Sequence, residues 1–223
     1  MKIHHWTLIV VAVLTGDVAA AQLYLPVPPT TGENTWQLIL TNVAPSPAAF
    51  KRTIFSPGQV PSAQGVTGLY PFQTSIAAEQ GESAAHLEII DPLKPGISVS
   101  SRLVDQQDHA SRLPVLKASN IVARGKPVTF QFWPAIAPLE SATIVVFSPA
   151  KIESTCSVAL NSNIGRISST SLTVPAASQI ATVEVSAAAQ VDFVRIVCNR
   201  PVLAFSYRAG SGGLEFIAPA NSE

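Results

Sequence analysis

Few residues of this chain have the type and spacing that chemistry requires. His109 lies in a polar run beside Asp105 and Asp108. Carboxylate and imidazole together can hold a metal weakly, although a solvated linker explains the same residues. The sequence contains no G-x-S-x-G nucleophile motif, no H-E-x-x-H zinc motif and no G-x-x-x-x-G-K-[ST] phosphate loop. Because catalysis needs several converging polar groups, we predict a protein that is not an enzyme and that uses no cofactor or metal.

The other histidine beyond the N-terminal segment, His86, lies in a segment of alternating pattern. In a β-strand, alternate side chains point to opposite faces. His86 and Glu88 then share one face, and the apolar residues share the other: Ala85, Leu87 and Ile89. The pattern predicts that His86 and Glu88 lie on a solvated strand face.

Two cysteines, Cys156 and Cys198, are the remaining reactive side chains. Each alternates in phase with apolar neighbours, Val158 for the first and Ile196 for the second, so both thiols are predicted to point inward. An even count in an exported chain favours one disulfide, with two buried free thiols as the alternative. Closing an interval of 42 residues (198 − 156) would stabilise the fold by about 4 kcal/mol.

Two tryptophans, Trp36 and Trp133, are candidate partner-binding residues. Each lies at one end of a predicted strand, near a proline-rich stretch. Exposed aromatic rings can stack on sugars or anchor a protein partner. Other aromatic residues could join such a platform: Tyr24, Tyr70, Phe72 and Tyr207. A place in the core of a β-sandwich also explains both tryptophans, and it is the interpretation we favour.

The first 21 residues resemble a secretory signal. Lys2 precedes a short apolar stretch, Trp6–Thr15, and Ala19–Ala21 offers a small-residue cleavage site. The apolar stretch is shorter than the roughly 20 residues that span a bilayer, and no longer one follows. We therefore expect an exported protein, periplasmic or extracellular, with no transmembrane segment in its mature chain.

Charge is balanced and sparse. The sequence has 14 Lys and Arg, 14 Asp and Glu, and only 13% charged residues, about half the usual share of roughly 25%. A nucleic-acid partner is not expected, because no basic stripe is present. A low-charge surface fits contact with a protein or a cell surface.

Short apolar runs separated by Pro, Gly and Asn predict an all-β chain. The main predicted strands are 36–42, 50–55, 72–77, 84–90, 97–104, 115–122, 127–133, 142–147, 156–160, 171–174, 181–185, 191–198 and 203–207. Ser56–Gly68 is predicted to be a long loop and Asp105–Arg112 a linker.

An internal repeat is indicated by two pairs of segments related by 106 residues (201 − 95). Pro95–Arg102 aligns with Pro201–Arg208, and Leu38–Asn42 aligns with Ile144–Ser148. We predict a signal peptide at 1–21 and two β-sandwich units at 22–112 and 113–223. Each unit would be an immunoglobulin-like or fibronectin-like antiparallel sandwich. A single sandwich in which the two halves intertwine is the alternative.

The pattern Trp36-x-Leu38-x-Leu40-x-Asn42 after a proline-rich start resembles a loose group of exported bacterial β-sandwich proteins, and this group implies no activity. The layout, together with Val128–Pro134 opening the second unit, is similar to that of periplasmic pilus-assembly chaperones. That resemblance implies a cationic pair that grips the C-terminal carboxylate of a pilus subunit, with Lys117 and Arg124 as the nearest candidates. The proline-rich acidic stretch of that family is missing here.

These features predict a non-catalytic exported module that contacts a protein or a cell surface, as an envelope, adhesin-like or appendage-associated component. Sheet edges and proline-rich loops would make the contacts. A periplasmic assembly chaperone and a carbohydrate-binding module are the alternatives.

Overall fold

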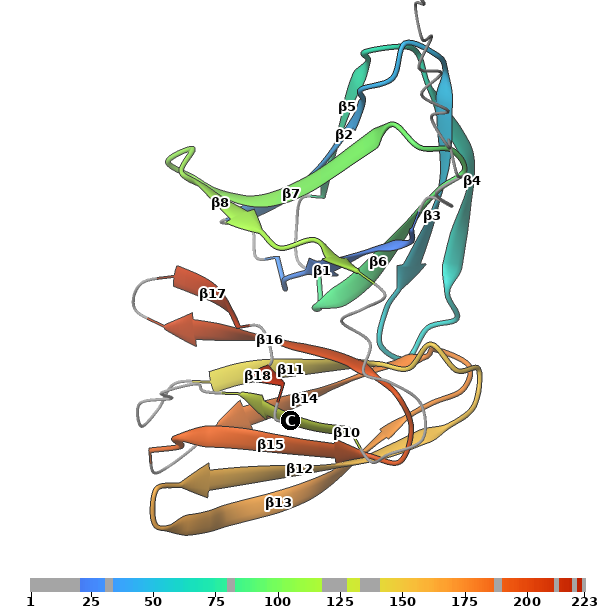
Figure 1. Ribbon diagram of the computed structural model, residues 1–223. Coiled ribbons are helices and arrows are strands. Elements are labelled where there is room, and N and C mark those ends of the chain that lie inside the picture. Colours follow the sequence, from blue (N-terminus) through green and yellow to red (C-terminus); the bar gives the residue numbers. More distant parts are fainter. Residues whose placement is uncertain are drawn as a thin grey trace, which may run out of the picture.

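The computed structural model describes residues 21–30, 34–79, 83–117, 128–132, 141–186, 190–210, 213–217 and 220–221. All regular structure within these ranges is β-strand (Figure 1), so the all-β prediction is confirmed. The predicted signal segment at 1–21 lies outside the described residues except for its last residue. The fold therefore concerns the part of the chain predicted to be the mature protein.

Two antiparallel sheets make up the first half. Its inner sheet has the strand order β4-β3-β6-β1-β9, and its outer sheet has the order β5-β2-β7-β8. The inner strands are β1 (Leu23–Val27), β3 (Ala48–Phe55), β4 (Ser62–Leu69), β6 (His86–Pro92) and β9 (Leu116–Lys117). The outer strands are β2 (Asn34–Asn42), β5 (Thr74–Glu79), β7 (Ile97–Asp105) and β8 (Ala110–Leu113).

The second half is also built from two antiparallel sheets. Its inner sheet has the order β14-β11-β16-β17, and its outer sheet has the order β13-β12-β15-β10-β18. The inner strands are β11 (Ser141–Phe147), β14 (Ile180–Ser186), β16 (Leu203–Gly210) and β17 (Gly213–Ile217). The outer strands are β10 (Val128–Phe132), β12 (Ser154–Ser162), β13 (Gly165–Val174), β15 (Phe193–Cys198) and β18 (Ala220–Asn221).

The halves repeat one topology. Adding nine to each strand number of the first half gives the strand order of the second half in both sheets. Backbone bonds repeat as well: the Asn42 amide donates to the Gln73 carbonyl, and the Ser148 amide donates to the Gln179 carbonyl. The donor and the acceptor of the second bond each follow their equivalents in the first bond by 106 residues. Each described sheet contains strands from one half of the chain only. This contradicts the alternative in which the two halves intertwine in one sandwich.

One of the two predicted repeat alignments is wrong by one residue. Leu38 lies opposite Ser101 in the first half, and its equivalent Ile144 lies opposite Ser206. The shift is therefore 106 for β2 to β11 but 105 for β7 to β16. A one-residue slip turns every side chain to the other face of a strand, so the apparent match of Pro95–Arg102 with Pro201–Arg208 placed inward residues over outward ones.

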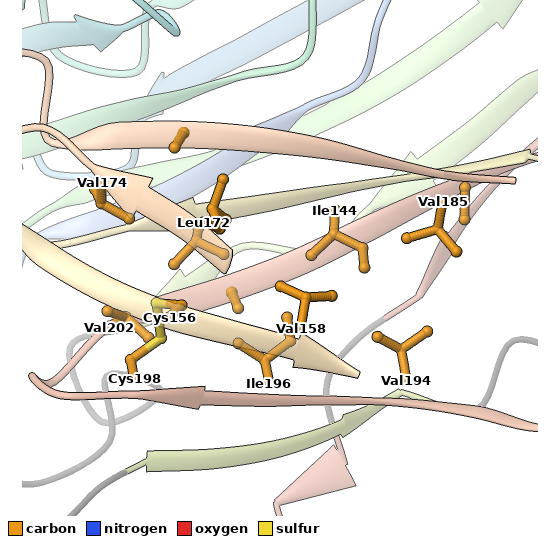
Figure 2. Close-up of a cluster of buried hydrophobic side chains, with 14 of the residues drawn as sticks. Ile144, Cys156, Val158, Leu172, Val174, Val185, Val194, Ile196, Cys198 and Val202 are labelled. Carbon is orange, nitrogen blue, oxygen red and sulfur yellow. A yellow bond between two sulfur atoms is a disulfide. The ribbon is translucent and has the colours of Figure 1, made fainter. Parts of the chain in front are cut away.

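Each half has its own core between its two sheets. The first-half core comprises Leu25, Val27, Trp36, Leu38, Leu40, Phe50, Leu69, Ile90 and Leu113. The second-half core includes Ala142, Ile144, Val146, Cys156, Val158, Leu172, Val174, Val185, Val194, Ile196 and Cys198, most of which Figure 2 labels. The disulfide between Cys156 and Cys198 lies inside this core and joins directly opposed residues of β12 and β15. The disulfide prediction is confirmed.

A third core joins the two inner sheets. It comprises Tyr24, Phe55, Ala85, Leu87, Ile89, Leu116, Val145, Phe147, Ile180, Leu203, Phe205 and Tyr207. The Phe147 ring packs edge-on against Phe55, with 4.9 Å between ring centroids. The inner sheets are thus covered on both faces, which explains the nearly continuous apolar sequence of β11, whereas the half-covered β2 alternates.

Two predicted irregular segments are strands. The predicted linker Asp105–Arg112 forms the β7–β8 hairpin, whose turn is closed by amides of Gln107 and His109 donating to Asp105 Oδ1. Because β8 and β9 pair within the first-half sheets, those sheets extend to Lys117, beyond the predicted boundary at 112. The predicted loop Ser56–Gly68 contains most of β4, an edge strand whose exposed residues lack apolar alternation.

Candidate functional site

Three turns at one end of the first half present a group of exposed apolar side chains, which we name the apolar tip: Val43, Tyr70, Phe72 and Leu93. Tyr70 is 76% exposed and Phe72 is 68% exposed. The turns meet in space, since the Val43 amide donates to the Gly96 carbonyl at 2.7 Å and Asn42 Nδ2 donates to the Tyr70 carbonyl at 3.0 Å. Figure 1 shows the β2–β3 and β4–β5 turns together, at the top of the first half.

Buried Asn42 holds the turns of the tip together. Its Nδ2 donates to the carbonyls of Ser46, Leu69 and Tyr70, and its Oδ1 accepts the Ala44 amide. An amide that satisfies several backbone groups in this way rigidifies a loop. The apolar tip is therefore a fixed surface.

Backbone strain is found in the same place. Phe72 has a φ of 58°, in the left-handed region that residues other than Gly, Asn and Asp rarely adopt. Gly96 has a φ of 110°, and a Cβ there would lie 2.7 Å from the Ala44 Cβ. Gln179, in the corresponding turn of the second half, has a φ of 59°, so a strained residue belongs to the turn that both halves share.

The second half lacks an equivalent tip. At the positions of Val43, Phe72 and Leu93 it has Pro149, Ser178 and Asn199. In the turn before β14, Gln179 Nε2 instead donates to the carbonyls of Ser148 and Pro149. The apolar display belongs to the first half and is not a by-product of the shared fold.

Four charged side chains meet between the sheets of the first half, and we name them the buried charge cluster: Arg52, Glu79, His86 and Glu88. Arg52 binds both carboxylate oxygens of Glu88, with Nε donating to Oε2 at 2.8 Å and Nη2 to Oε1. Glu88 is fully buried. Such a two-point pair is the geometry in which Arg best compensates a buried carboxylate.

The His86 ring lies between a backbone carbonyl and two carboxylates. Its Nδ1 lies 3.1 Å from the Ala84 carbonyl oxygen, which can only accept, so Nδ1 carries a hydrogen. Its Nε2 lies 3.4 Å from Glu79 Oε2 and 3.9 Å from Glu88 Oε1. Glu79 Oε2 is nearer but makes no hydrogen bond, so Glu79 acts on His86 through its charge.

The environment of His86 favours its charged form. Burial acts to lower its pKa, but the hydrogen bonds with Glu88 and the Ala84 carbonyl and the charges of Glu79 and Glu88 outweigh burial and raise the pKa above its ordinary value of 6.5. The prediction that His86 and Glu88 lie on a solvated face is wrong. Their face of β6 covers the first-half core, because both faces of the inner sheet are covered.

Of the four predicted partner-binding residues, the structure describes Trp36 and Lys117. Trp36 has no exposed surface and lies in the first-half core, so it cannot stack on a sugar. Lys117 is exposed at the end of β9, opposite Leu23 of β1. Arg124 and Trp133 lie outside the described residues. Tyr70 and Phe72 were recognisable as aromatic residues, whereas Val43 and Leu93 gave no signal beyond being apolar residues next to Pro-containing turns.

Within the described ranges, no group of three or more His, Cys, Asp or Glu side chains is arranged to hold a metal ion. His109 is exposed, and its Nδ1 lies 3.1 Å from Asp105 Oδ2 across the β7–β8 turn. The described part of the chain contains no helix with the length and apolar character needed to cross a bilayer.

Comparison with protein-family models, with curated proteins and with solved structures gives no match to this chain.

Proposed function

We propose that this protein is a non-catalytic, exported module that binds another protein through the apolar tip. The observation that carries the proposal is the exposure of Tyr70 and Phe72 on turns fixed by Asn42. Aromatic anchors on a preorganised surface are typical of interface hot spots, because little conformational entropy is lost when they bind.

The charge of the tip supports a protein partner of low charge. Its turns are Val43–Pro47, Tyr70–Gln73 and Leu93–Gly96, which together contain one charged residue, Lys94. The centres of protein interfaces are depleted in charged residues and enriched in Tyr and Phe. A low-charge apolar surface of this kind is costly to leave in water unless a partner covers it.

Site-specific photo-cross-linking in cells tests the proposal. A photoreactive residue at position 72 is expected to capture one defined protein, and the same residue at position 164 is the control. Ile164 is 94% exposed in the β12–β13 turn of the second half, so it reports non-specific contact with apolar surface. Equal capture of the same proteins at both positions would overturn the proposal.

Binding of the captured partner should then depend on the ring of Phe72. Phe72→Gly removes the ring and relieves the left-handed backbone, so the fold of the turn is retained. Losing an interface hot spot costs about 2 kcal/mol or more, which is a loss of affinity of roughly 30-fold. Ile164→Gly should leave the affinity unchanged.

A further inference from the structure

The second half contains a groove at the edge of its sandwich. It has a volume of about 280 Å³ and lies between β13 of the outer sheet and β14 of the inner sheet. Its lining residues are Val158, Leu160, Ser168, Thr170, Val183, Glu184, Val185 and Ser186. Val158 and Val185 belong to the second-half core (Figure 2), so the groove gives access to the side of that core.

The size and lining of the groove indicate what could occupy it. The groove is much larger than the voids of native cores, few of which exceed a water molecule of about 30 Å³ in the liquid. Pockets for drug-sized ligands have volumes of roughly 300–1,000 Å³ and converging polar groups. This groove is smaller and has one ionisable lining residue, Glu184. A few aliphatic side chains fit it better.

Both walls of the groove are sheet edges. In the described part of the chain, β13 pairs only with β12, and β14 pairs only with β11. β13 has ten residues, is exposed from Gly165 to Ser171, and contains no proline and a single charge, Arg166. An edge strand of this length with so few charges presents a row of unpaired backbone N–H and C=O groups, which is a template for an added strand.

The inward positions of β13 leave the core open at this edge. Ser168 and Thr170 share a face with the buried Leu172, yet both are exposed and small. Leu160 and Val183 are only partly buried and pack against the core. An added strand would cover these side chains with every second residue and would pair its backbone with β13.

In the first half, the buried charge cluster occupies the position that corresponds to this groove. Arg52 and Glu79 stand at the positions of Val158 and Val185, each related by 106 residues. The cluster fills this part of the sandwich with charged side chains, of which Arg52 and Glu88 form a two-point ion pair and His86 lies 3.4 Å from Glu79. The second half has valines there, and it leaves room for an apolar occupant.

We infer that this groove binds an extended segment of a partner protein, which adds to β13 as a strand and places alternate small apolar side chains against Leu160 and Val183. Backbone pairing would supply affinity, and the apolar floor would set the alternation. Glu184 at the rim favours a segment that is neutral or basic. This inference does not rest on the apolar tip, which lies on the other half of the chain.

A displayed library of random decapeptides, selected against the whole protein, tests the inference. Selected peptides are expected to alternate small apolar and polar residues and to lose at least tenfold in affinity for Val183→Lys or Thr170→Lys. Thr67→Lys adds the same charge to β4, the corresponding edge strand of the first half, and should leave the affinity unchanged. Bound peptide should also slow amide hydrogen exchange along β13.

Selected peptides that bind both groove variants as tightly as the parent protein, or that leave exchange along β13 unchanged, would overturn the inference. So would a selection that enriches no peptide. None of these results bears on the test at Phe72, so the two proposals can fail separately.

Discussion

The two halves share a strand order but fill equivalent core positions with opposite chemistry. Where the first half has the partly buried Arg52 and Glu79 and the fully buried Glu88, the second half has Val158, Val185 and Val194. Each pair is related by the same 106 residues, so the fold itself does not demand either choice. Buried ion pairs often stabilise a fold no more than well-packed apolar residues of similar volume. The main consequence of the charge cluster is therefore that charged side chains occupy this space, and its effect on the stability of the half is secondary.

A second difference lies beside the first. The second half is cross-linked by Cys156–Cys198, whereas the equivalent, directly opposed residues of the first half are Phe50 and Pro92. The half that lacks the charge cluster, and has an open groove, is the one with the covalent link. The disulfide therefore stabilises the half that lacks the charge cluster.

The largest effect is expected from breaking the charge cluster on one side only. Glu88→Ala leaves the partly buried Arg52, whose side chain is 17% exposed, without its carboxylate. This should cost about 3–5 kcal/mol of unfolding free energy, measured by urea denaturation. The double variant Arg52→Val/Glu88→Val copies the second half and should recover most of this loss. If the double variant is as unstable as Glu88→Ala, the two halves are not interchangeable at this position.

Removing the disulfide should have the next largest effect. Cys156→Ala/Cys198→Ala is expected to lower the unfolding free energy by about 2–4 kcal/mol, because the unfolded chain regains the freedom of a closed loop. A calorimetric scan of the parent and the variant measures the change. An unchanged unfolding temperature would contradict the role that we assign to the cross-link.

A smaller effect is expected from pH. The pKa of His86 is raised in the folded protein, so the stability that its charged form provides is fully present below the unfolded pKa of about 6.5. This stability is lost as pH rises through the folded pKa. The unfolding free energy should therefore fall with rising pH in this window, and His86→Gln should remove that part of the slope.

A pH slope that persists in His86→Gln would show that the proton assigned to the charge cluster is elsewhere, because the amide of Gln does not titrate in this range.

Alternation of apolar residues was enough to predict the half-covered strands. In β2 the inward residues Trp36, Leu38 and Leu40 alternate with more polar ones, and the predicted and observed strands agree closely. The same rule failed for β6, where His86 and Glu88 are as buried as their apolar neighbours. Alternation separates the two faces of a strand, but it does not tell which of them another sheet will cover.

The candidate sites depended on distant residues that no local pattern connects. Arg52 and Glu88 are 36 residues apart, and the groove opens between strands whose edges become visible only in the sheet order. Edge strand β4 was predicted as a loop because its exposed side chains need no apolar period. The sequence pattern identifies strands by the apolar residues that they bury. It therefore missed the exposed edge strands and turns, which are the parts available to contact a partner.

The smallest effect on stability is expected on the outer face of the first half, which faces away from the second half. Thr41 on the outer face of the first half is equivalent to Phe147 on the face that joins the halves. Its hydroxyl pairs with that of Thr74, at 3.0 Å. Thr41→Ala should change the unfolding free energy by no more than about 0.5 kcal/mol, with Phe147→Ala as the destabilising counterpart. Where no described sheet follows, this face carries polar residues such as Gln37 and Thr41 beside the exposed Ile76. The end units of repeat proteins likewise present a more polar outer face. A concentration-dependent loss of stability in Thr41→Ala would instead mean that another copy covers this face.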